Sequence, residues 1–463
     1  MKKVFFTIMA TVCLMFVACG KDDVAIESVS LNASFLSLAE GETAILTVTI
    51  EPASAAEKSL IWSSSNESVA SVSSNGEVTA IATGVAIITV TSKDGMSLAT
   101  CIVMVNINAK IVMTTEKSGD VIFTIQYSGN ICIDWGDGTN SELYSSPIEA
   151  SFSFSHNYTD SSIHVITITG GNITHLNCSN ELTGLDVSQH PMLISLYCEN
   201  NRLTSLDISN NTGLKHLLCG LNQLTSLNVG NNIALTELRC NFNQLTNLEV
   251  SNNIVLTLLT CDGNQLTSLD VSNNIALTEL SCGGNQLTSL DVNKNIALIR
   301  LYCGLNRLTS LDVNENIALT NLFCFENQLT SLDVSRNTEL EYLMCSNNEI
   351  SSLDLSNNNA ITWLSCGSNP LTSFDVGNYS ILLYLDCSNL QLTSLDMSKY
   401  TVLNDLDCRS NQLSAEALND LFRSLNSSPP ITSGRKDLCI QDNPGTDSCN
   451  IIIAGYKGWT VWK

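Results

Sequence analysis

The chain has 463 residues, of which 45 are Asp or Glu and 21 are Lys or Arg, so its formal net charge is −24. Such an acidic chain excludes a nucleic-acid binder, because the phosphate backbone would repel it. With 44% hydrophobic and 14% charged residues, the chain is expected to fold. Its five histidines form no HExxH pair, and no P-loop or G-x-S-x-G motif occurs. We therefore predict neither an enzyme nor a bound cofactor or metal.

The N-terminal segment is predicted to be an export signal. Two lysines precede the apolar run Val4 to Ala18, which is too short to span a bilayer and has the length of a signal-peptide core. Its end, Phe16-Val17-Ala18-Cys19, resembles a lipobox. The resemblance implies that residues 1–18 are a lipoprotein signal peptide and that Cys19 carries the lipid. An ordinary cleaved signal is the alternative.

Residues 19–23 are predicted to form a short lipid-anchored linker. Gly20-Lys21-Asp22-Asp23 resembles the acidic export tag of Bacteroidetes-type surface lipoproteins. The resemblance implies attachment to the outer membrane, facing the extracellular side, with a periplasmic orientation as the alternative. No later apolar stretch is long enough to cross a bilayer, so the lipid is the only membrane contact that we expect.

Residues 24–106 are predicted to form a small β-sandwich. Short alternating strands such as residues 43–50 and 60–62 are separated by turn signals. Several stretches resemble the group 2 bacterial immunoglobulin-like (Ig-like) domain, which implies a spacer or adhesion module. The matching stretches are Leu38 to Thr43, Ile61 to Asn66, Val69 to Val72, Asn75 to Ala80 and Ala82 to Val90.

Residues 107–170 are predicted to form a second small β domain. The stretches Ile133 to Thr139 (IDWGDGT) and Phe154 to Thr159 (FSHNYT) together resemble a PKD-type β-sandwich. Asp134 and Asp137 flank a tight glycine turn, where carboxylates commonly accept hydrogen bonds from backbone amides. Turn chemistry is the favoured role of both residues. Calcium binding is the alternative, although two carboxylates supply too few oxygens for that ion.

From Ile173 onward the chain repeats. Cysteines recur with one step of 20 residues and then ten steps of 21, at positions 178, 198, 219, 240, 261, 282, 303, 324, 345, 366, 387 and 408. The unit reads L-x-x-L-x-C-x-x-N-x-L-T-S-L-D-V-S-x-N-x-x, which resembles a leucine-rich repeat of a 21-residue bacterial variety. The resemblance and the repeat count imply a solenoid of about twelve coils over residues 171–413.

The alternation within one unit predicts two short strands per coil. Leu259 and Cys261 share one strand face, and Leu269 and Val271 share another. One coil cannot bury these groups alone, so stacking must complete the core. We expect parallel sheets on two sides of a weakly curved, flattened solenoid. The fold class is therefore mainly β, with two small β-sandwich domains followed by a leucine-rich repeat solenoid.

The recurring cysteines and asparagines are predicted to be structural. Each cysteine stands where leucine-rich repeats usually have Leu, so a small buried hydrophobe is the favoured role. Disulfides or thiolate metal sites within the series are the disfavoured alternatives, since parallel Cβ vectors keep neighbouring cysteines too far apart and no histidine recurs with them. An asparagine follows three residues after most of these cysteines, from Asn201 to Asn369 and again at Asn411, and its amide can bond backbone groups of the turn. Leu390 breaks the series.

Residues 414–463 are predicted to cap the array. Leu418, Leu421, Phe422 and Leu425 have helical spacing, and apolar strand material follows. Cys439 and Cys449 lie outside the repeat, ten residues apart, in a chain predicted to reach an oxidising compartment. We therefore expect a disulfide between them.

The outward positions of the cysteine strand are the candidate binding surface. Aromatic residues collect at these positions on the seventh to eleventh coils, and exposed aromatic patches on a rigid scaffold often mark interfaces. The alternative is that these side chains stack on one another or meet another copy of the chain. The predicted ligand-binding residues are Tyr302, Phe323, Phe325, Tyr342, Met344, Trp363 and Tyr384.

The second strand predicted in each coil carries an outward row of acids. Solubility is the favoured explanation of this row. Cation binding and recruitment of a basic partner are the alternatives. The row comprises Asp186, Asp207, Glu249, Asp270, Asp291, Asp312, Asp333, Asp354, Asp375 and Asp396, with Asn228 in place of one acid.

Together these features predict a cell-surface lipoprotein that binds an extracellular protein through its repeat face. Resemblance to bacterial surface leucine-rich proteins of the internalin type, which carry immunoglobulin-like modules, implies adhesion. A carbohydrate ligand is the first alternative, because aromatic platforms also stack on sugars. A structural spacer without a ligand is the second.

Overall fold

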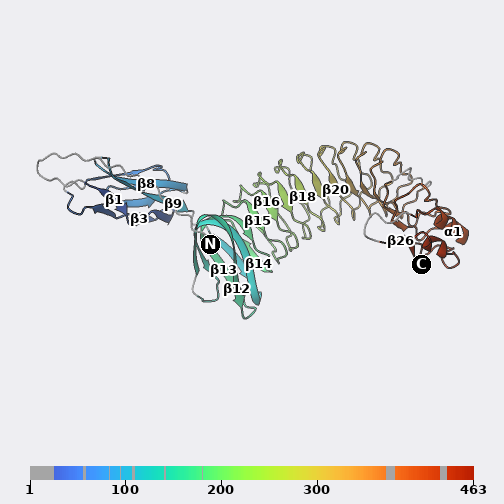
Figure 1. The fold of residues 1–463 in the computed structure, drawn as a ribbon, viewed down its shortest axis with the longest axis horizontal. Helices are drawn as coiled ribbons and strands as arrows, with labels where there is room; N and C mark the ends of the chain where they lie inside the picture. Colours follow the sequence, from blue (N-terminus) through green and yellow to red (C-terminus); the bar gives the residue numbers. More distant parts are fainter. Residues whose placement is uncertain are drawn as a thin grey trace. The chain divides into compact units, whose positions relative to one another are not determined.

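The computed structural model describes residues 26–55, 59–82, 84–93, 95–106, 110–139, 142–179, 181–371, 381–427 and 435–463. The expected signal peptide, the lipid-bearing Cys19 and the linker 19–23 lie outside these residues. The chain divides into two compact units, residues 1–108 and 109–463. Each unit is β-rich (Figure 1).

The first unit is the β-sandwich expected from the sequence. Its three sheets have the strand orders β1-β4, β2-β9-β8-β5 and β3-β7-β6. Alternate residues of β8 are buried, among them Ala86 and Ile88, and they pack with Val78 and Val103 in a core of its own. The strands are β1 (Ser28–Leu31), β2 (Phe35–Ala39), β3 (Thr43–Ile45), β4 (Val48–Glu51), β5 (Leu60–Ser64), β6 (Ala70–Val72), β7 (Glu77–Ala80), β8 (Gly84–Ser92) and β9 (Leu98–Asn106).

The second unit begins with an antiparallel sheet of long strands. Its core contains Phe123, Tyr127 and Trp135, and the Tyr158 hydroxyl donates a hydrogen bond of 2.6 Å to the Trp135 carbonyl. This sheet and the solenoid share one continuous core. The strands are β10 (Lys110–Thr115), β11 (Gly119–Asp134), β12 (Glu142–Tyr158), β13 (His164–Asn177) and β14 (Leu182–Asp186).

Strand β13 runs across residue 170, where we expected a domain to end. Its first residues pair antiparallel with β10 and β11, and residues 175–177 pair parallel with the first strand of the solenoid. Gly170 and Gly171 have φ of 78° and 66°, and a Cβ on Gly170 would lie 2.6 Å from the Asn130 carbonyl oxygen. These glycines let one strand take part in both the antiparallel and the parallel pairing of one continuous sheet.

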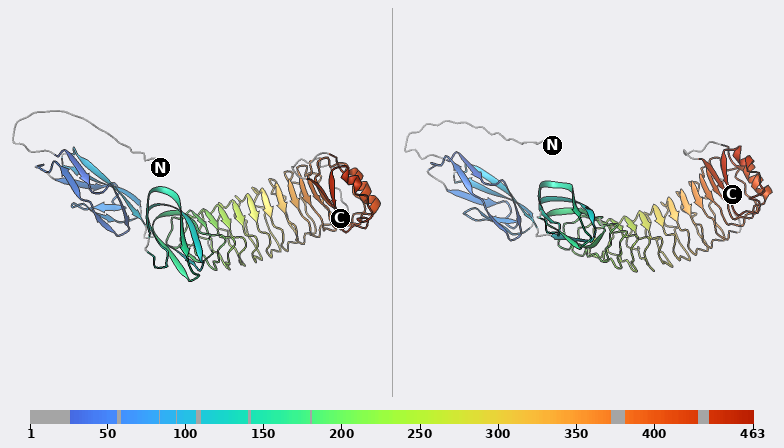
Figure 2. Two further views of the ribbon diagram at one scale, coloured as in Figure 1. Left: turned by 60° about the horizontal axis from the view of Figure 1, so that its bottom comes forward. Right: turned by 90° about the horizontal axis from the view of Figure 1, so that it is seen from below.

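Each coil of the solenoid contributes one three-residue strand to a parallel sheet, whose arrows line one side of the solenoid in Figure 2. The central Leu of each strand is buried and in register with the central Leu of the next. The strands are β15 (Ser195–Tyr197), β16 (His216–Leu218), β17 (Glu237–Arg239), β18 (Leu258–Thr260), β19 (Glu279–Ser281), β20 (Arg300–Tyr302), β21 (Asn321–Phe323), β22 (Tyr342–Met344), β23 (Trp363–Ser365), β24 (Tyr384–Asp386) and β25 (Asp405–Asp407).

The second sheet that we expected is not formed by the described Leu-Thr-Ser-Leu-Asp-Val segments. Leu and Val of these segments are buried as predicted. Their backbones, however, join neighbouring coils at a single position, as in the 2.8 Å bond from Gln265 N to Leu245 O. The amide two residues after the aspartate, Ser272 N in this coil, donates its hydrogen bond to the Asp270 side chain and not to the backbone of a neighbouring coil. The repeated backbone-to-backbone bonding that defines a sheet is therefore missing.

Buried asparagines join successive coils at both turns, as predicted for the turn after the cysteine strand. Asn264 accepts a 3.0 Å bond from Leu245 N and donates 3.0 Å bonds to the carbonyls of Cys240 and Cys261. In the other turn Asn274 donates bonds of 2.9 Å to the carbonyls of Val250 and Asn253. The same bonds recur along the array. Backbone groups that a tight turn leaves open are thereby satisfied within the core.

The cap begins with a helix and continues the sheet. The helix α1 (Ala415–Ser424) is capped by the Ser414 side chain and buries Leu418, Leu421 and Phe422. The other elements are β26 (Lys436–Cys439), α2 (Ile452–Gly455) and β27 (Trp459–Trp462). No helix in the described part of the chain is long and apolar enough to cross a bilayer.

Strand β26 adds a coil that the cysteine count misses, which brings the solenoid to about 13 turns. Leu438 is in register with Leu406, Ile440 replaces the recurring cysteine, and Asn443 makes the usual bonds to Leu413 N, Cys408 O and Ile440 O. The signal was present in the sequence, because Leu438-x-Ile440-x-x-Asn443 repeats the L-x-C-x-x-N pattern with Ile for Cys.

The disulfide expected between Cys439 and Cys449 is absent, and both are free thiols. The register of β26 explains this difference. Cys439 follows the buried Leu438 and faces outward beside Asp407. Cys449 is buried within the cap, where its thiol lies 3.3 Å from the Thr446 carbonyl oxygen. The two thiols therefore have different surroundings and are not bonded to each other.

We predict that Asn264→Ala lowers the free energy of unfolding by about 2–4 kcal/mol, because it leaves three buried backbone groups without a partner. Asn273→Ala is the matched control. Asn273 lies in the same coil as Asn264 but is exposed, and it donates a single 3.2 Å bond to the Ser251 carbonyl. Its effect should stay below about 1 kcal/mol. Urea unfolding measures both. Equal losses would contradict a structural role specific to the buried amide.

We predict that His190 makes the protein sensitive to acid. This residue takes the place of the buried asparagine in the first coil, and burial lowers its pKa from 6.5 to about 4. The unfolded chain therefore binds a proton at a higher pH than the folded chain. Stability falls as the pH drops from 6.5 toward 4, by about 3 kcal/mol in total. His190→Asn should reduce this loss in urea titrations at pH 7 and pH 4.5, and identical pH dependence in both proteins would refute the assignment.

Candidate binding surface

The solenoid strands present two outward columns of side chains. In each strand the residues before and after the buried Leu face outward, and the in-register pairing aligns them from coil to coil. On β20 to β24 the first column holds Tyr342, Trp363 and Tyr384. The second column holds Tyr302, Phe323 and Met344. The structure thus brings six of the seven predicted residues onto adjoining strands, and we call these six the aromatic patch.

Phe325, the seventh predicted residue, lies in the turn after the strand. It is partly buried, and its ring covers the backbone of Gly304 in the preceding coil. A Cβ at Gly304 would lie 2.8 Å from this ring, so glycine leaves the space that the ring fills. Phe325 therefore borders the aromatic patch and packs mainly against its own solenoid.

Ring contacts order the aromatic patch. Tyr302 and Phe323 meet edge to face, with centroids 4.9 Å apart, whereas Trp363 and Tyr384 are stacked at 3.9 Å with an interplanar angle of 9°. Tyr342 and Trp363 remain 36% and 37% exposed. Because the sheet already holds two such rings at the spacing of neighbouring strands, stacking them loses little further conformational entropy. The patch is consequently stiff and still open to a partner.

Acidic residues border the aromatic patch toward the cap. Asp386 accepts a 2.7 Å bond from the Ser365 hydroxyl, and Asp407 pairs with Arg409 at 2.6 Å. The Asp405 carboxylate, next to Tyr384 in the first column, has no hydrogen bond or ion pair among the residues that the structure describes. Burial, followed by repulsion from Asp437, raises the pKa of Asp405. Sequence reasoning placed Asp405 in the same outward column as Tyr384 but did not count it among the ligand-binding residues.

The outward face of the earlier coils differs, because its charges are already paired. Glu237 pairs with Arg239 at 2.6 Å, and Glu279 pairs with Arg300 at 2.6 Å. His216 lies 3.3 Å from Glu237. Because each of these charged side chains already has a partner of opposite charge, a ligand would find no unpaired charge among them to bind. The segment from the aromatic patch to Asp405 is therefore the part of the outward face that is best suited to contact a partner.

The acidic row on the opposite side proves to be turn chemistry. Each described aspartate of the row accepts a bond from the amide two residues later, as in the 2.9 Å bond from Ser272 N to Asp270. Glu249 differs, because its longer side chain instead accepts a 3.4 Å bond from the Asn247 side chain. Asn228, which has no charge, accepts the same 2.9 Å bond from Gly230 N. The row thus conserves an acceptor oxygen from coil to coil, whether or not it is charged. These bonds lower the pKa of Asp207, Asp270, Asp333 and Asp354.

Asp134 and Asp137 also hold a turn. Asp134 accepts a 2.9 Å bond from Gly136 N, and Asp137 accepts bonds from the amide and hydroxyl of Thr139. His156 lies 2.6 Å from Asp137 and stacks on Trp135. Among the described residues no group of three or more His, Cys, Asp or Glu could hold a metal ion.

The twelve recurring cysteines form a buried file that we call the cysteine ladder. All are free and fully buried, from Cys178 to Cys408. Burial raises the pKa of these thiols, to about 12 for Cys240, so the reactive thiolate is suppressed at neutral pH. This agrees with the predicted role of a small buried hydrophobe.

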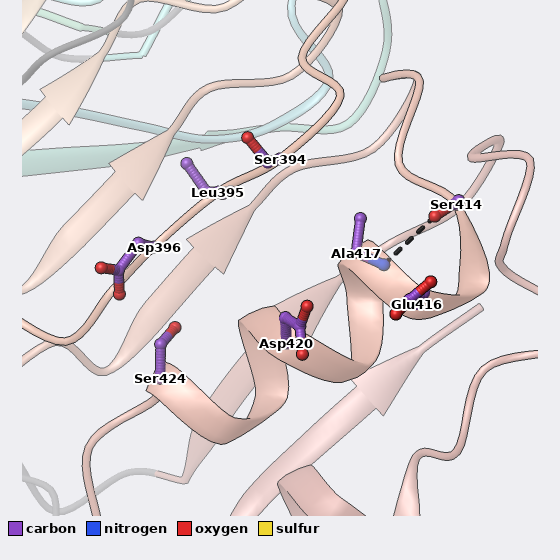
Figure 3. Close-up of a pocket in the computed structure, with 8 residues that line it drawn as sticks. All are labelled: Ser394, Leu395, Asp396, Ser414, Glu416, Ala417, Asp420 and Ser424. Carbon is purple, nitrogen blue, oxygen red and sulfur yellow. Dashed lines mark hydrogen bonds between the residues drawn. The ribbon is translucent and has the colours of Figure 1, made fainter.

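A hollow of about 410 Å³ lies beside α1 in the cap (Figure 3). Asp396, Glu416 and Asp420 line it, together with the side chains of Ser414 and Ser424. Most of these groups already have structural partners. Asp396 accepts from Ser398 N, Asp420 pairs with Arg423, and the two serines bond to the backbone of α1. The hollow therefore offers no converging set of free groups for a ligand.

Comparisons with known proteins agree with the fold. Residues 25–103 match the family model of the group 2 bacterial Ig-like domain. The functional domain of InlJ from Listeria monocytogenes, which includes a cysteine ladder, is 32% identical with a TM-score of 0.55, covering 65% of this chain and 69% of that one. The internalin InlF from the same species is 22% identical with a TM-score of 0.54, covering 62% and 86%.

Sequence matches to whole proteins are short. An uncharacterized protein from Clostridium acetobutylicum is 46% identical over 77 residues, which is 16% of this chain and 19% of that protein. The chain spans between 7% and 19% of the length of the four curated relatives that it matches.

The fold and these matches define the class of the protein. The chain is a leucine-rich repeat protein of the internalin type, with a group 2 bacterial Ig-like domain before its repeats. The cysteine ladder is a feature that it shares with the InlJ domain.

We predict that the cysteine ladder does not react with a water-soluble maleimide under native conditions, because burial denies access and suppresses the thiolate. The partly exposed Cys132 and Cys439 are the internal controls and should be labelled. Mass spectrometry of tryptic peptides, before and after denaturation, measures the difference. Native labelling of Cys261 as fast as that of Cys439 would show that the coils do not seal their core.

Proposed function

We propose that the protein is a cell-surface adhesion module that binds an extracellular protein through the aromatic patch and Asp405. The observation that carries this proposal is the exposed Tyr342 and Trp363 on a rigid sheet, with the Asp405 carboxylate next to Tyr384 in the same column. Aromatic side chains on stiff scaffolds supply much of the binding free energy of protein interfaces. The internalin-type solenoid and the Ig-like domain support a binding role at the surface rather than catalysis.

The ring geometry favours a protein ligand over a glycan. A sugar stacks on the open face of an aromatic ring, but Trp363 and Tyr384 cover one face of each other at 3.9 Å. Tyr302 and Phe323 likewise block each other through their edge-to-face contact. Each ring of these pairs is therefore partly covered by its neighbour, which leaves less open ring face for a sugar and favours the mixed apolar and polar surface of a protein.

The charge pattern favours a partner with a cationic side chain. Asp405 adjoins the stacked pair, and Asp386 and Asp407 lie in the neighbouring column. A lysine or arginine placed here would pair with the Asp405 carboxylate. Partial burial of Asp405 strengthens such a pair, because solvent screens it less.

We further propose that the chain is held at the outer membrane by a lipid on Cys19, facing outward. The support is the lipobox-like Phe16-Val17-Ala18-Cys19 and the acidic residues that follow it. The Ig-like domain would then serve as a spacer between the lipid and the solenoid.

We predict that Tyr342→Ala combined with Trp363→Ala and Tyr384→Ala abolishes binding to an immobilised panel of extracellular-matrix proteins, and that Asp405→Asn weakens it about tenfold. The matched control is alanine at His216 and Leu258, which occupy the same column on earlier coils and should leave binding unchanged. Surface plasmon resonance measures affinity, and thermal unfolding confirms that each variant is folded. A parallel glycan array tests the alternative ligand.

Three outcomes would overturn the proposal. One is unchanged binding by the triple variant. Another is loss of binding in the control. The third is binding to glycans alone, which would assign the same patch to a carbohydrate ligand. A protein that binds neither panel would be the spacer considered above.

A further inference from the structure

Strand β12 is an open edge of the antiparallel sheet that begins the second unit. Its residues 150–158 pair with residues 119–127 of β11 without a shift in register, and β12 pairs with no other strand that the structure describes. In an edge strand, every second residue directs its backbone N–H and C=O groups away from the sheet. These groups are available to a further strand. We call residues 150–156 the open edge segment.

The open edge segment lacks the features that usually keep a sheet edge from pairing. Its sequence, ASFSFSH, contains no Asp, Glu, Lys, Arg or Pro. Charged side chains, proline and bulges are the common protections of an exposed edge. In β12 a proline and a bulge occur just before the segment, where residues 147–149 leave the ladder and Pro147 has no N–H to donate. Pairing is thus blocked before residue 150 and left open after it.

The open edge segment is self-complementary. Residues 151–155 read SFSFS, which is the same in both directions about Ser153. Opposite residues of an antiparallel pair have numbers of constant sum, so a two-fold axis at Ser153 places each Ser opposite Ser and each Phe opposite Phe. Phe152 of one copy then faces Phe154 of the other on one side of the sheet. The serines face one another on the other side.

Such a pairing would cover an aromatic side chain that a single chain leaves exposed. Phe152 is 40% exposed, although its ring centroid lies 5.4 Å from that of Tyr127. Phe154 is buried and stacks on Phe123 at 5.7 Å. Directly opposite residues of an antiparallel pair have Cβ atoms about 4.5–5.5 Å apart. Phe152 would therefore join the ring cluster around Phe154 of the second copy.

The acid nearest to the open edge segment would meet a hydrogen-bond donor. With the axis at Ser153, Glu149 of one copy comes beside Asn157 of the other. The Asn157 side chain donates one N–H to Asp120 at 2.7 Å, so its second N–H is directed elsewhere and can reach Glu149. The two copies of Glu149 would lie about 27 Å apart along the strands, too far to repel strongly.

The other charged groups of β11 and β12 do not oppose the pairing either. Asp134 and Glu142 lie on the far side of the bulge, outside the open edge segment. His156 is the titratable residue within the segment, and it lies 2.6 Å from Asp137 of its own chain. Opposite His156 the two-fold axis places Ala150, which carries no charge.

From the open backbone groups and the self-complementary sequence, we infer that two copies of this chain associate through β12, antiparallel and with a two-fold axis at Ser153. A second copy is the occupant because it supplies an edge with the matching sequence, a ring to pair with each ring, and no charge opposite a like charge. The antiparallel sheets of the two copies would then continue into each other, joined by backbone hydrogen bonds.

This contact does not depend on the proposed adhesive function. Strand β12 belongs to the antiparallel sheet, whereas the aromatic patch lies on β20 to β24. A dimer would carry two aromatic patches, and two-point attachment strengthens the binding of weak modules to a cell surface without any new contact. The triple alanine variant of the aromatic patch should therefore dimerise normally.

Sedimentation velocity on the purified chain over a wide range of concentrations tests the association. We expect a monomer–dimer equilibrium that Ser153→Lys shifts at least about tenfold toward monomer, because two like charges then meet at the axis. An equimolar mixture of Ser153→Lys and Ser153→Asp should restore the dimer. Ser145→Lys is the matched control, since exposed Ser145 lies on β12 beyond Pro147, and it should leave the equilibrium unchanged.

Cross-linking with a short bismaleimide tests the register. Ser153→Cys should cross-link to itself, because the axis brings the two introduced thiols together. Ser151→Cys should not, since its two thiols would lie about 14 Å apart along the strands. A mixture of Ser151→Cys and Ser155→Cys should cross-link, because these positions face each other. Mass spectrometry of tryptic peptides separates these products from those of the native Cys132 and Cys439.

The inference fails if the chain is monomeric at every concentration. It also fails if Ser145→Lys dissociates the dimer as strongly as Ser153→Lys, or if Ser151→Cys cross-links to itself as fast as Ser153→Cys. Hydrogen exchange of the backbone amides supplies a further readout. A monomer whose residues 150–156 become protected only when an extracellular-matrix protein is added would assign the open edge segment to a strand of that protein instead.

Discussion

The hydrogen bonds of the buried asparagines are the interaction on which the solenoid depends. Asn264 joins the Leu245, Cys240 and Cys261 backbones, and its equivalents do the same from coil to coil. Without these bonds the tight turns would bury open carbonyl and amide groups at a high cost in free energy. Because most coils meet this requirement in the same way, they stack at one spacing and one register. His190 and Leu390, which replace asparagine, stand toward the two ends of the array.

A fixed register gives every other position of the repeat a single environment. The cysteine ladder is sealed because each thiol lies between two others in a dry core, and the raised pKa of these thiols follows from the same burial. The aspartate row supplies acceptors to the turns of the opposite side. Residues with chemically reactive side chains are thus used for packing and turn formation. Recognition is left to the outward positions, where the repeat imposes no residue type.

Two outward surfaces result from this arrangement, and they differ in chemistry. The aromatic patch combines partly covered rings with the Asp405 carboxylate and suits a heterologous partner. A second surface is a uniform apolar row of exposed isoleucines, which comprises Ile233, Ile254, Ile275, Ile296 and Ile317. Both surfaces depend on the rigid spacing of the coils, since neither rings nor isoleucines would line up on a flexible chain. The leucine-rich repeat therefore works as a scaffold whose variable positions carry the function.

The sequence by itself determined the solenoid, its buried positions and the column in which the aromatic patch lies, because a strict 21-residue period with alternating apolar residues has one way to bury them. The Ig-like domain was equally readable from its strand and turn pattern. Only the tertiary structure decided which backbone bonds form between coils, and so reduced two expected sheets to one. It also decided the register of β26, which turns Cys439 outward, away from Cys449, and which neighbours cover the ring faces. These features depend on contacts between residues far apart in the chain, and no local pattern encodes such distances.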